Sequence, residues 1–499
     1  MICLTSETIR QMFAQLIANC SSSQTLSDYI SNNSSLIDEF VDSGIEVQRE
    51  QKDLFEEFVL LGSRVKILDS MDFSISQNRA FIAILFDYAE RVNASAVLLQ
   101  LYQIIQKHNI DVGSRLKASI LYLYNVPNNQ VYVDRFDDIC SKLQTAINEE
   151  DDNDSKAIAT FLNYYSSVIF NTAPHVQFAQ ELQSKALVSC SKYPFLQKDV
   201  ITASISLDVN QADLTYSTIQ ATIDELLCKQ RRQSVSLQTG FIIELNTNYS
   251  QLLSNTPQSF DRIRQIAVSQ LDLFQNKDEI FHSLGRGVAI LEQEEQLFSY
   301  MKSYGLMHKA KLVAALSHFP FEKIKENHIE IYDWSCGQGM ASIILLEYLR
   351  EHNIHFSINM ITLIEPSEIA LKRASLHVKH FDVDVEVKTV LKDMDSLLNN
   401  DVRGSNEYVK IHMFSNILDV ETFSMQHLVK LIKQAFDGLN YFICVSPYIN
   451  DVKTARIDTF VNSFKHNESF RLLHQEVAVR GEWINNWTKL IKVFSVVLP

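Results

Sequence analysis

The chain contains little glycine, only 12 residues in 499, against an average near 7%. In such a chain, a pair of closely spaced glycines marks a place where the backbone must turn sharply or approach a ligand. Cysteine is also sparse, and the seven cysteines have no paired spacing. This argues against a disulfide framework or a zinc site and favours a cytoplasmic protein with reduced thiols.

Long apolar runs are missing too. No segment is apolar for the length of a bilayer crossing, so we expect no membrane insertion. The formal net charge of −15 disfavours a protein that wraps nucleic acid, although a local basic patch would be compatible with it. No His-x-x-x-His or Cys-x-x-Cys set is present, so we expect no metal site.

A chain of 499 residues exceeds what one hydrophobic core usually supports, which predicts a multidomain protein. Over residues 1–257 apolar residues recur at helical spacing, as in Ile9, Met12 and Leu16. The rhythm resembles stacked helical hairpins of the tetratricopeptide or HEAT kind, without a fixed repeat signature. We therefore predict a solenoid-like all-α array of no identified family. Breaks between helices are expected at residues 32–34, 109–113, 125–129, 149–154 and 172–174.

Residues 258–325 also have a helical pattern, and Gly305 is a natural helix stop. Pro320 separates this stretch from the C-terminal region. We interpret it as a helical linker or as a cover over a ligand site. The alternative, that it is the last helical pair of the array, stays open.

From residue 326 to 499 the pattern changes to short apolar runs that alternate with amphipathic helices. This predicts an α/β domain with a Rossmann-like, doubly wound parallel sheet. The link between the last two runs is too short for a helical crossover, so they should form an antiparallel hairpin, giving a seven-stranded mixed sheet. The expected strands are 329–332, 359–364, 385–390, 409–414, 441–445, 472–479 and 490–498.

The first expected strand runs directly into the sequence Asp-Trp-Ser-Cys-Gly-Gln-Gly at residues 333–339. A helix-like segment comes next, at residues 340–349. Glycine permits close approach of backbone to a ligand, and the free amides of a helix start face whatever is bound there. The loop therefore predicts a nucleotide-type ligand site.

This loop, five alternating strand–helix units and the closing hairpin together resemble the class I S-adenosylmethionine-dependent methyltransferase domain. The motif Asp333-x-Ser335-x-Gly337-x-Gly339 matches the family's acidic-x-Gly-x-Gly-x-Gly loop, except that serine replaces the first glycine. The resemblance implies that these four residues bind S-adenosyl-L-methionine, with the charge of Asp333 near its ammonium group.

Two further carboxylates come directly after the second and third expected strands. Glu365 stands where the family places the residue that accepts both ribose hydroxyls. Asp393 matches the position that faces the adenine amino group, although Asp395 is nearly as well placed. The alternative is that these carboxylates only cap helices.

A nicotinamide-binding Rossmann domain is a lesser alternative, because Gly337-x-Gly339-x-x-Ser342 approximates its fingerprint. Serine in the third position and the terminal hairpin count against it.

Residues for catalysis are harder to identify. The fourth expected strand ends near Asn416 and Asp419, where Asn416 would orient a nucleophile and Asp419 or His412 would take its proton. His412 inside a strand is more typical of packing, and Asn416 and Asp419 would also serve as helix caps.

We predict a methyltransferase whose helical region recruits or positions a protein partner or the methyl acceptor. The acceptor itself stays open among RNA, protein and small molecule. The alternative is a non-catalytic helical interaction protein that carries a degenerate methyltransferase-like domain.

Overall fold

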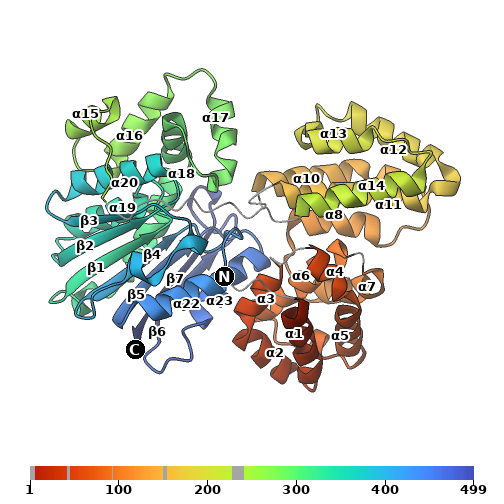
Figure 1. The fold of residues 1–499 in the computed structure, drawn as a ribbon, viewed down its shortest axis with the longest axis horizontal. Helices are drawn as coiled ribbons and strands as arrows, with labels where there is room; N and C mark the ends of the chain where they lie inside the picture. The colour runs from red at the N-terminus through yellow and green to blue at the C-terminus, as the bar shows by residue number, and fades with distance from the viewer. Residues whose placement is uncertain (1–5, 42–44, 93, 150–153, 228–240) are drawn as a thin grey trace. The chain divides into compact units, whose positions relative to one another are not determined.

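A computed structural model describes the chain except for residues 1–5, 42–44, 93, 150–153 and 228–240. Two compact units make up the chain. The helical unit comprises Ile2–Arg231 with Ile449–Ala455, and the α/β unit comprises Arg232–Tyr448 with Arg456–Pro499 (Figure 1). Each unit is described by itself.

The described part of the helical unit consists of helices and short connections, which confirms the all-α prediction. A connection lies at each predicted break, with residues 150–153 outside the described ranges, but other connections, such as those at residues 65–75 and 189–198, were not predicted. The helices are α1 (Ser6–Asn19), α2 (Ser23–Asn32), α3 (Ser34–Val41), α4 (Ile45–Glu50), α5 (Lys52–Arg64), α6 (Ser76–Arg91), α7 (Ser95–Lys107), α8 (Gly113–Leu123), α9 (Gln130–Asp134), α10 (Phe136–Glu149), α11 (Ser155–Asn171), α12 (Gln177–Val188), α13 (Asp199–Ile205) and α14 (Ala212–Leu227).

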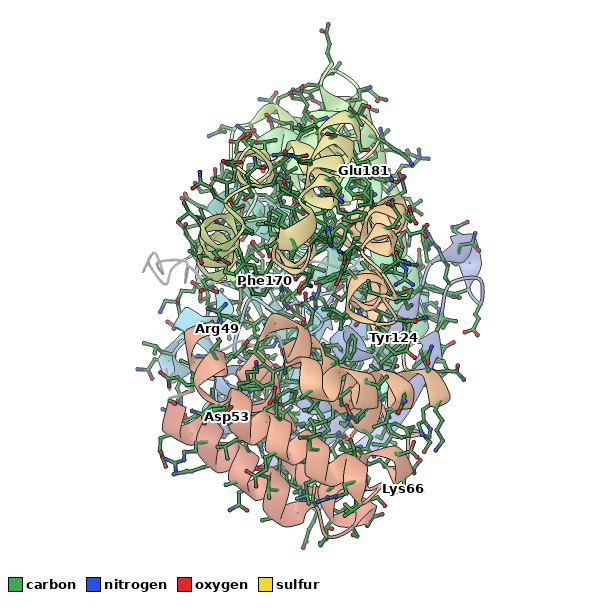
Figure 2. All side chains as sticks on the ribbon, turned by 90° about the vertical axis from the view of Figure 1, so that its right-hand side faces the viewer. Arg49, Asp53, Lys66, Tyr124, Phe170 and Glu181 are labelled. Atoms are coloured by element: carbon green, nitrogen blue, oxygen red, sulfur yellow. The ribbon has the colours of Figure 1, made fainter. Side chains whose placement is uncertain are left out.

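The helices of this unit pack around two hydrophobic clusters. One is built from α1 to α8 around Phe13 and Phe55, and the other from α8 to α14 around Phe136 and Phe161. On the surface, Arg49 of α4 forms an ion pair of 2.5 Å with Asp224 of α14. Figure 2 shows Arg49 with other surface side chains of this unit. The predicted solenoid-like stacking stays a prediction.

Charged side chains are also buried inside the helical unit, between α6, α8 and α11. Asp87 accepts from Arg91 at 2.8 Å and from Arg115 at 2.7 Å. Glu90 lies 3.6 Å from Arg115 and accepts from the Tyr122 hydroxyl at 3.1 Å. Burial alone would raise the pKa of Asp87, but the two arginines hold it below its usual value. These buried carboxylates therefore have cationic partners.

The α/β unit contains one seven-stranded sheet in the order β3-β2-β1-β4-β5-β7-β6. Strands β1 to β5 are parallel, and β7 is antiparallel to both β5 and β6. This confirms the predicted mixed sheet with its terminal hairpin. The strands are β1 (His328–Trp334), β2 (Ser357–Ile364), β3 (Glu386–Val390), β4 (Val409–Ser415), β5 (Gly438–Ser446), β6 (Arg471–Ala478) and β7 (Lys489–Leu498).

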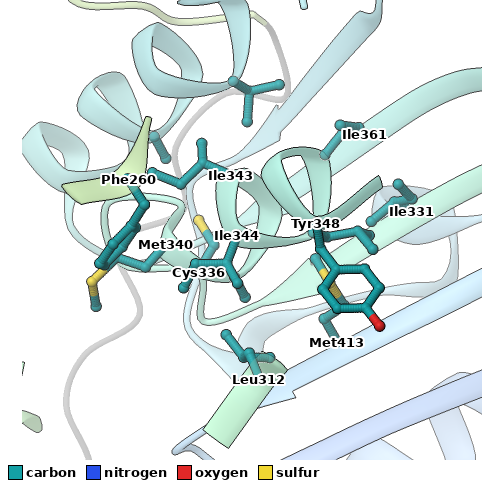
Figure 3. Packing of buried hydrophobic residues seen from close by; sticks show 14 of the residues in the cluster. Phe260, Leu312, Ile331, Cys336, Met340, Ile343, Ile344, Tyr348, Ile361 and Met413 are labelled. Atoms are coloured by element: carbon teal, nitrogen blue, oxygen red, sulfur yellow. The ribbon is translucent and has the colours of Figure 1, made fainter. Parts of the chain in front are cut away.

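Helices cover both faces of this sheet, so the unit has three layers (Figure 1). Alternate residues of the strands face the two hydrophobic cores, with Ile331 on one side and Tyr332 on the other. Figure 3 shows the first core, where Phe260 and Leu312 meet Met340 and the strand residue Met413. The helices that contribute to the first core include α16 (Phe260–Leu271), α17 (Lys277–Ser283), α18 (Glu294–Leu316), α19 (Met340–Glu351) and α20 (Glu368–Phe381). Those that contribute to the second include α21 (Asn399–Val402), α22 (Met425–Ala435) and, from Arg456 onward, α23 (Asp451–Asn462).

Arg373 of α20 is 1% exposed and contacts the segment that precedes β1. Its guanidinium pairs with Glu244 and, at 2.8 Å, with Glu294, and it lies 3.5 Å from the ring centroid of Tyr249. Tyr249 belongs to α15 (Asn248–Ser254). The structure thus groups residues from Arg232 onward with the α/β unit, whereas the predicted array ends at residue 257.

Helix α18 runs from Glu294 to Leu316 without a break at Gly305, so the expected helix stop there is wrong. A Cβ on Gly305 would lie 3.3 Å from Phe260 of α16. The glycine therefore serves the close approach of the two helices, and the hydrophobic contact outweighs its low helix propensity. Neither α18 nor any other helix in the described ranges is long and apolar enough to cross a membrane.

Candidate functional site

The site lies at the carboxyl ends of the parallel strands, where the direction of the chain connections reverses. From β1 the chain crosses to β2 and β3 on one side, whereas β4 and β5 lie on the other side. The loops after β1 and β4 therefore diverge at this point. In open α/β sheets, such a switch point is where ligands bind.

The loop after β1 uses left-handed backbone at three positions. Ser335 has φ 49°, Gly337 has φ 52° and Gly339 has φ 75°. Ser335 thus adopts a left-handed conformation, which favours glycine, and glycine is the residue that the family motif has at this position. A Cβ on Gly337 would meet nothing within 4 Å, whereas one on Gly339 would lie 3.0 Å from Cβ of Ala374. Gly337 faces open space, and Gly339 lets α19 pack closely on α20.

Asp333 lies within β1 and is 1% exposed. Its Oδ2 accepts from the backbone amide of Ser342 at 3.1 Å and from the Ser342 hydroxyl at 2.7 Å. Its Oδ1 is buried and has no hydrogen-bond partner among the described residues. Burial raises the pKa of Asp333 to about 7. A buried hydrogen-bond acceptor without a donor destabilises the fold, and such an atom is expected where a bound ligand supplies the donor.

Glu365 comes directly after β2 and is 8% exposed. Its carboxylate accepts from the backbone amides of Gly337 at 2.9 Å and Ser367 at 3.0 Å. Burial, with a smaller contribution from the charge of Asp333, raises the pKa of Glu365 to about 7. The side chain thus reaches the glycine loop from the next strand, so the structure brings Asp333, Gly337 and Glu365 into one site.

Asp393, after β3, is mainly engaged in its own turn. Its Oδ1 accepts from the amides of Asp395 at 3.0 Å and Ser396 at 2.9 Å, and its Oδ2 accepts from the Ser396 hydroxyl at 2.8 Å. Asp395 accepts instead from the amide of Ser424 at 2.8 Å. Asp393 therefore forms a helix cap, the structural role that the sequence left open.

Asn416 comes directly after β4 with φ 57°, and its side-chain amide is held at both ends by α18. Its Oδ1 accepts from Nζ of Lys311, and its Nδ2 lies 2.6 Å from Nε2 of His308. The Ser415 hydroxyl lies 3.2 Å from Nδ1 of the same ring. Burial holds the pKa of His308 well below its usual value, so the neutral ring can accept a hydrogen bond.

Asp419 lies on the same side of the sheet and accepts from the Ser446 hydroxyl, at the end of β5, at 2.7 Å. Lys311 is fully buried. Burial lowers the pKa of Lys311 to about 7 even though the charge of Asp419 acts in the opposite direction. Of the two residues predicted from the sequence, Asn416 is hydrogen-bonded to Lys311 and His308 of α18, whereas Asp419 acts on Lys311 through its charge.

The sequence interpretation included a cover over a ligand site at residues 258–325 but did not identify the side chains of α18 that take part. Tyr300, Tyr304, His308 and Lys311 succeed one another at helical spacing and share one face of this helix. The ring centroid of Tyr300 lies 5.9 Å from that of His308, and burial, followed by the charges of Tyr304, Glu365 and Asp419, raises the pKa of Tyr300. The signal available in the sequence was that these polar residues recur every three or four positions along a predicted helix.

The remaining sequence candidate, His412, is buried in the α/β unit, as are the cysteines Cys336 and Cys444. His412 is fully buried between Trp334 and Asn440, and burial lowers its pKa to about 3. Cys336 and Cys444 are buried, and burial raises the pKa of both thiols well above the usual value. Over the described ranges, no group of three or more metal-ligating side chains occurs.

The sheet order and the terminal antiparallel hairpin decide the fold of the second unit. It has the class I methyltransferase fold. No protein-family model and no curated protein matches the chain. A putative class I S-adenosylmethionine-dependent methyltransferase from Listeria monocytogenes is similar at 13% identity over 68% of this chain and 90% of that chain, with a TM-score of 0.28.

Two further solved structures are similar at the same low level. The CurJ carbon methyltransferase is 12% identical over 74% of this chain and 99% of that chain, with a TM-score of 0.31. The plantazolicin methyltransferase BpumL, solved with S-adenosylhomocysteine, is 10% identical over 48% of this chain and 100% of that chain, with a TM-score of 0.30. At these values, none of the three adds to what the sheet order shows.

Proposed function

We propose that the α/β unit binds S-adenosyl-L-methionine and transfers its methyl group to an acceptor. The observation that carries this proposal is Oδ1 of Asp333, which has no hydrogen-bond partner in the described part of the chain and is buried beside a glycine loop at the switch point of a methyltransferase-type sheet. A cationic group that donates hydrogen bonds, such as the ligand's ammonium, would satisfy this oxygen.

The chain's residues fit such a ligand in three places. Gly337 presents backbone with open space where a side chain would stand. Glu365 holds its carboxylate at the loop through two backbone amides and would accept the two ribose hydroxyls. Asp393 would face the adenine amino group with Oδ2, which accepts a hydrogen bond from the Ser396 hydroxyl and has room for a second donor. The bound ligand supplies a methyl group on a reactive sulfonium, so the protein contributes mainly orientation.

The helical unit would recruit a protein partner or the acceptor, and the protein would act in the cytoplasm. Helical arrays commonly offer surfaces for peptide or protein partners. The exposed rings of Phe170 and Tyr124, 51% and 40% exposed, lie on this unit (Figure 2). Nucleic acid is a less favoured partner because the chain is acidic overall.

Calorimetric titration with S-adenosylmethionine, S-adenosylhomocysteine and NAD tests the cofactor assignment. The wild type should bind the first two and not NAD. Glu365→Ala should weaken binding by about 10- to 100-fold, because a charged acceptor of two hydrogen bonds contributes roughly 1.5–3 kcal/mol. The control Glu368→Gln removes a carboxylate that pairs with Lys372 at the surface and should leave binding unchanged.

If the protein bound none of the three ligands, the proposal would be overturned and the non-catalytic interaction protein would be the remaining alternative. Unchanged affinity in Glu365→Ala would show that the ribose carboxylate has been placed wrongly. Binding of NAD alone would instead favour the nicotinamide alternative.

A further inference from the structure

The acceptor side of the proposed site contains a fully buried lysine. Lys311 is 0% exposed, and among the described residues its Nζ has one hydrogen-bond acceptor, the side-chain oxygen of Asn416. No carboxylate lies within ion-pair distance of it in the same ranges. An ammonium group has three donors, and leaving two of them buried without partners carries a large desolvation penalty.

The surroundings of Lys311 are nevertheless well ordered by hydrogen bonds. Asn416 is fixed from both sides, by Lys311 at its oxygen and by His308 at its nitrogen. The backbone amide of Asn416 donates to the carbonyl of Val445 in the neighbouring strand at 2.7 Å. The lysine thus points from the cover helix α18 to the carboxyl end of β4, which adjoins the strand that carries Asp333.

A buried lysine without a counter-ion favours its neutral amine, and the pKa of about 7 agrees with this. A neutral amine is compatible with a neighbouring cationic sulfonium, whereas an ammonium would repel it. Asp419, whose charge acts on Lys311 in the direction that favours protonation, would stabilise the ammonium once a proton has been taken. The cluster therefore has the parts of a general base and its electrostatic support.

We propose that Lys311 is the general base of the methyl transfer, an inference that rests on the proposed function. The acceptor is then a hydroxyl group, such as a phenol, bound at the carboxyl ends of β4 and β5. A neutral amine acceptor already has a free electron pair, but a hydroxyl becomes a good nucleophile only when its proton is removed. A built-in base therefore favours an oxygen acceptor. Asn416 and His308 are positioning residues in this arrangement.

The atoms balance without a further reactant. The O–H bond of the acceptor breaks and its proton moves to Nζ of Lys311, while the oxygen forms a bond to the methyl carbon. The carbon–sulfur bond of the donor breaks with its electron pair remaining on sulfur, which leaves a neutral thioether. The lysine then releases its proton to water.

The first test needs no ligand. In the full chain labelled with ¹³C at the lysine ε-carbon, one resonance should be lost in Lys311→Met and should titrate near pH 7 in the wild type. The same substitution should raise Tm, because it removes a buried amine that has only one hydrogen-bond partner among the described residues, and it keeps the volume. Lys302→Met, on the same helix but not fully buried, is the control and should change neither property.

A Lys311 resonance that titrates above pH 9.5 would overturn the proposal, and so would a lower Tm in Lys311→Met, which would indicate a structural role. Both readouts are independent of cofactor binding. They therefore separate a failure of the lysine assignment from a failure of the proposed methyltransferase function.

The second test measures transfer from tritiated S-adenosylmethionine to catechol and 4-hydroxybenzoate, with benzylamine as the amine probe. The wild type should methylate a hydroxyl probe, with a rate that rises through about pH 7. Lys311→Met should bind S-adenosylhomocysteine as the wild type does but lose about 10²- to 10⁴-fold in kcat, together with that pH dependence. Transfer to benzylamine alone, transfer to no probe, or an unchanged pH profile in Lys311→Met would each overturn the proposal.

Discussion

The two units of the protein both bury charged side chains, but they surround them differently. In the helical unit, Asp87 is bonded to two arginines, and its pKa lies below the usual range. In the α/β unit, Lys311 has one neutral partner and one oxygen of Asp333 has none within the described ranges. Breaking a buried charge pair destabilises a core, whereas buried ionisable groups without a counter-ion cost stability and are retained where a ligand or a reaction uses them.

The largest effect is expected from breaking the paired network. Arg115→Met would leave Asp87 with one cationic partner and take the 3.6 Å ion pair away from Glu90. We expect the free energy of unfolding to fall by about 3–5 kcal/mol, as for other buried pairs that lose one member. Urea denaturation followed by circular dichroism measures this. The exposed Lys117→Met should stay within about 0.5 kcal/mol, and an equally small change in Arg115→Met would contradict the role given to the network.

A second prediction separates the two glycines of the loop. Gly339→Ala would place a Cβ 3.0 Å from Ala374 at a positive φ and should destabilise the α/β unit by about 2–4 kcal/mol. Gly337→Ala meets no atom, so it should cost only about 1 kcal/mol but should weaken S-adenosylhomocysteine binding. Thermal unfolding and calorimetric titration of both variants check this. Equal losses of stability would show that Gly337 is also a packing residue.

The contrast between the units also predicts opposite pH dependences. The pKa of Asp333 is raised to about 7 in the folded protein, so its contribution to stability is fully present below about pH 4 and is lost as the pH rises through 7. The pKa of Asp87 is lowered, so its contribution is present above about pH 4 and is lost on acidification.

Calorimetric Tm values from pH 3 to pH 8 measure both effects. Asp333→Asn should flatten the curve on its neutral side, and Asp87→Asn should flatten it on its acid side, while the exposed Asp384→Asn should leave it unchanged. If Asp333→Asn changed only the acid side, the carboxyl would be ionised in the folded protein.

The smallest effect is expected at Ser335, the one departure from the glycine motif. Its φ of 49° is unfavourable for a residue with a side chain, by roughly 1 kcal/mol. Ser335→Gly removes this strain but gives the unfolded chain more freedom, so we expect a gain of about 0.5 kcal/mol with S-adenosylhomocysteine affinity retained. Guanidinium unfolding resolves a change of this size, and a loss above about 1 kcal/mol would mean that the serine side chain contributes to the loop.

Much of the α/β unit could be predicted because its strands are short apolar runs bounded by clear breaks. The carboxylate of Glu365 and the glycine loop could be located because each comes directly after a strand. Asp393 could not be resolved, because a cap and an adenine contact need the same residue at the same position. Lys311 and His308 could not be assigned because their partner, Asn416, lies more than a hundred residues away in sequence.

The close contact between Gly339 and Ala374 has a consequence for how this sequence can diverge. Gly339 precedes α19 and Ala374 lies within α20, but neither can gain volume unless the two helices move apart. Homologues should therefore keep both residues small together, even where the rest of the loop changes. This coupled pair offers a means of recognising distant relatives whose overall sequence similarity has faded.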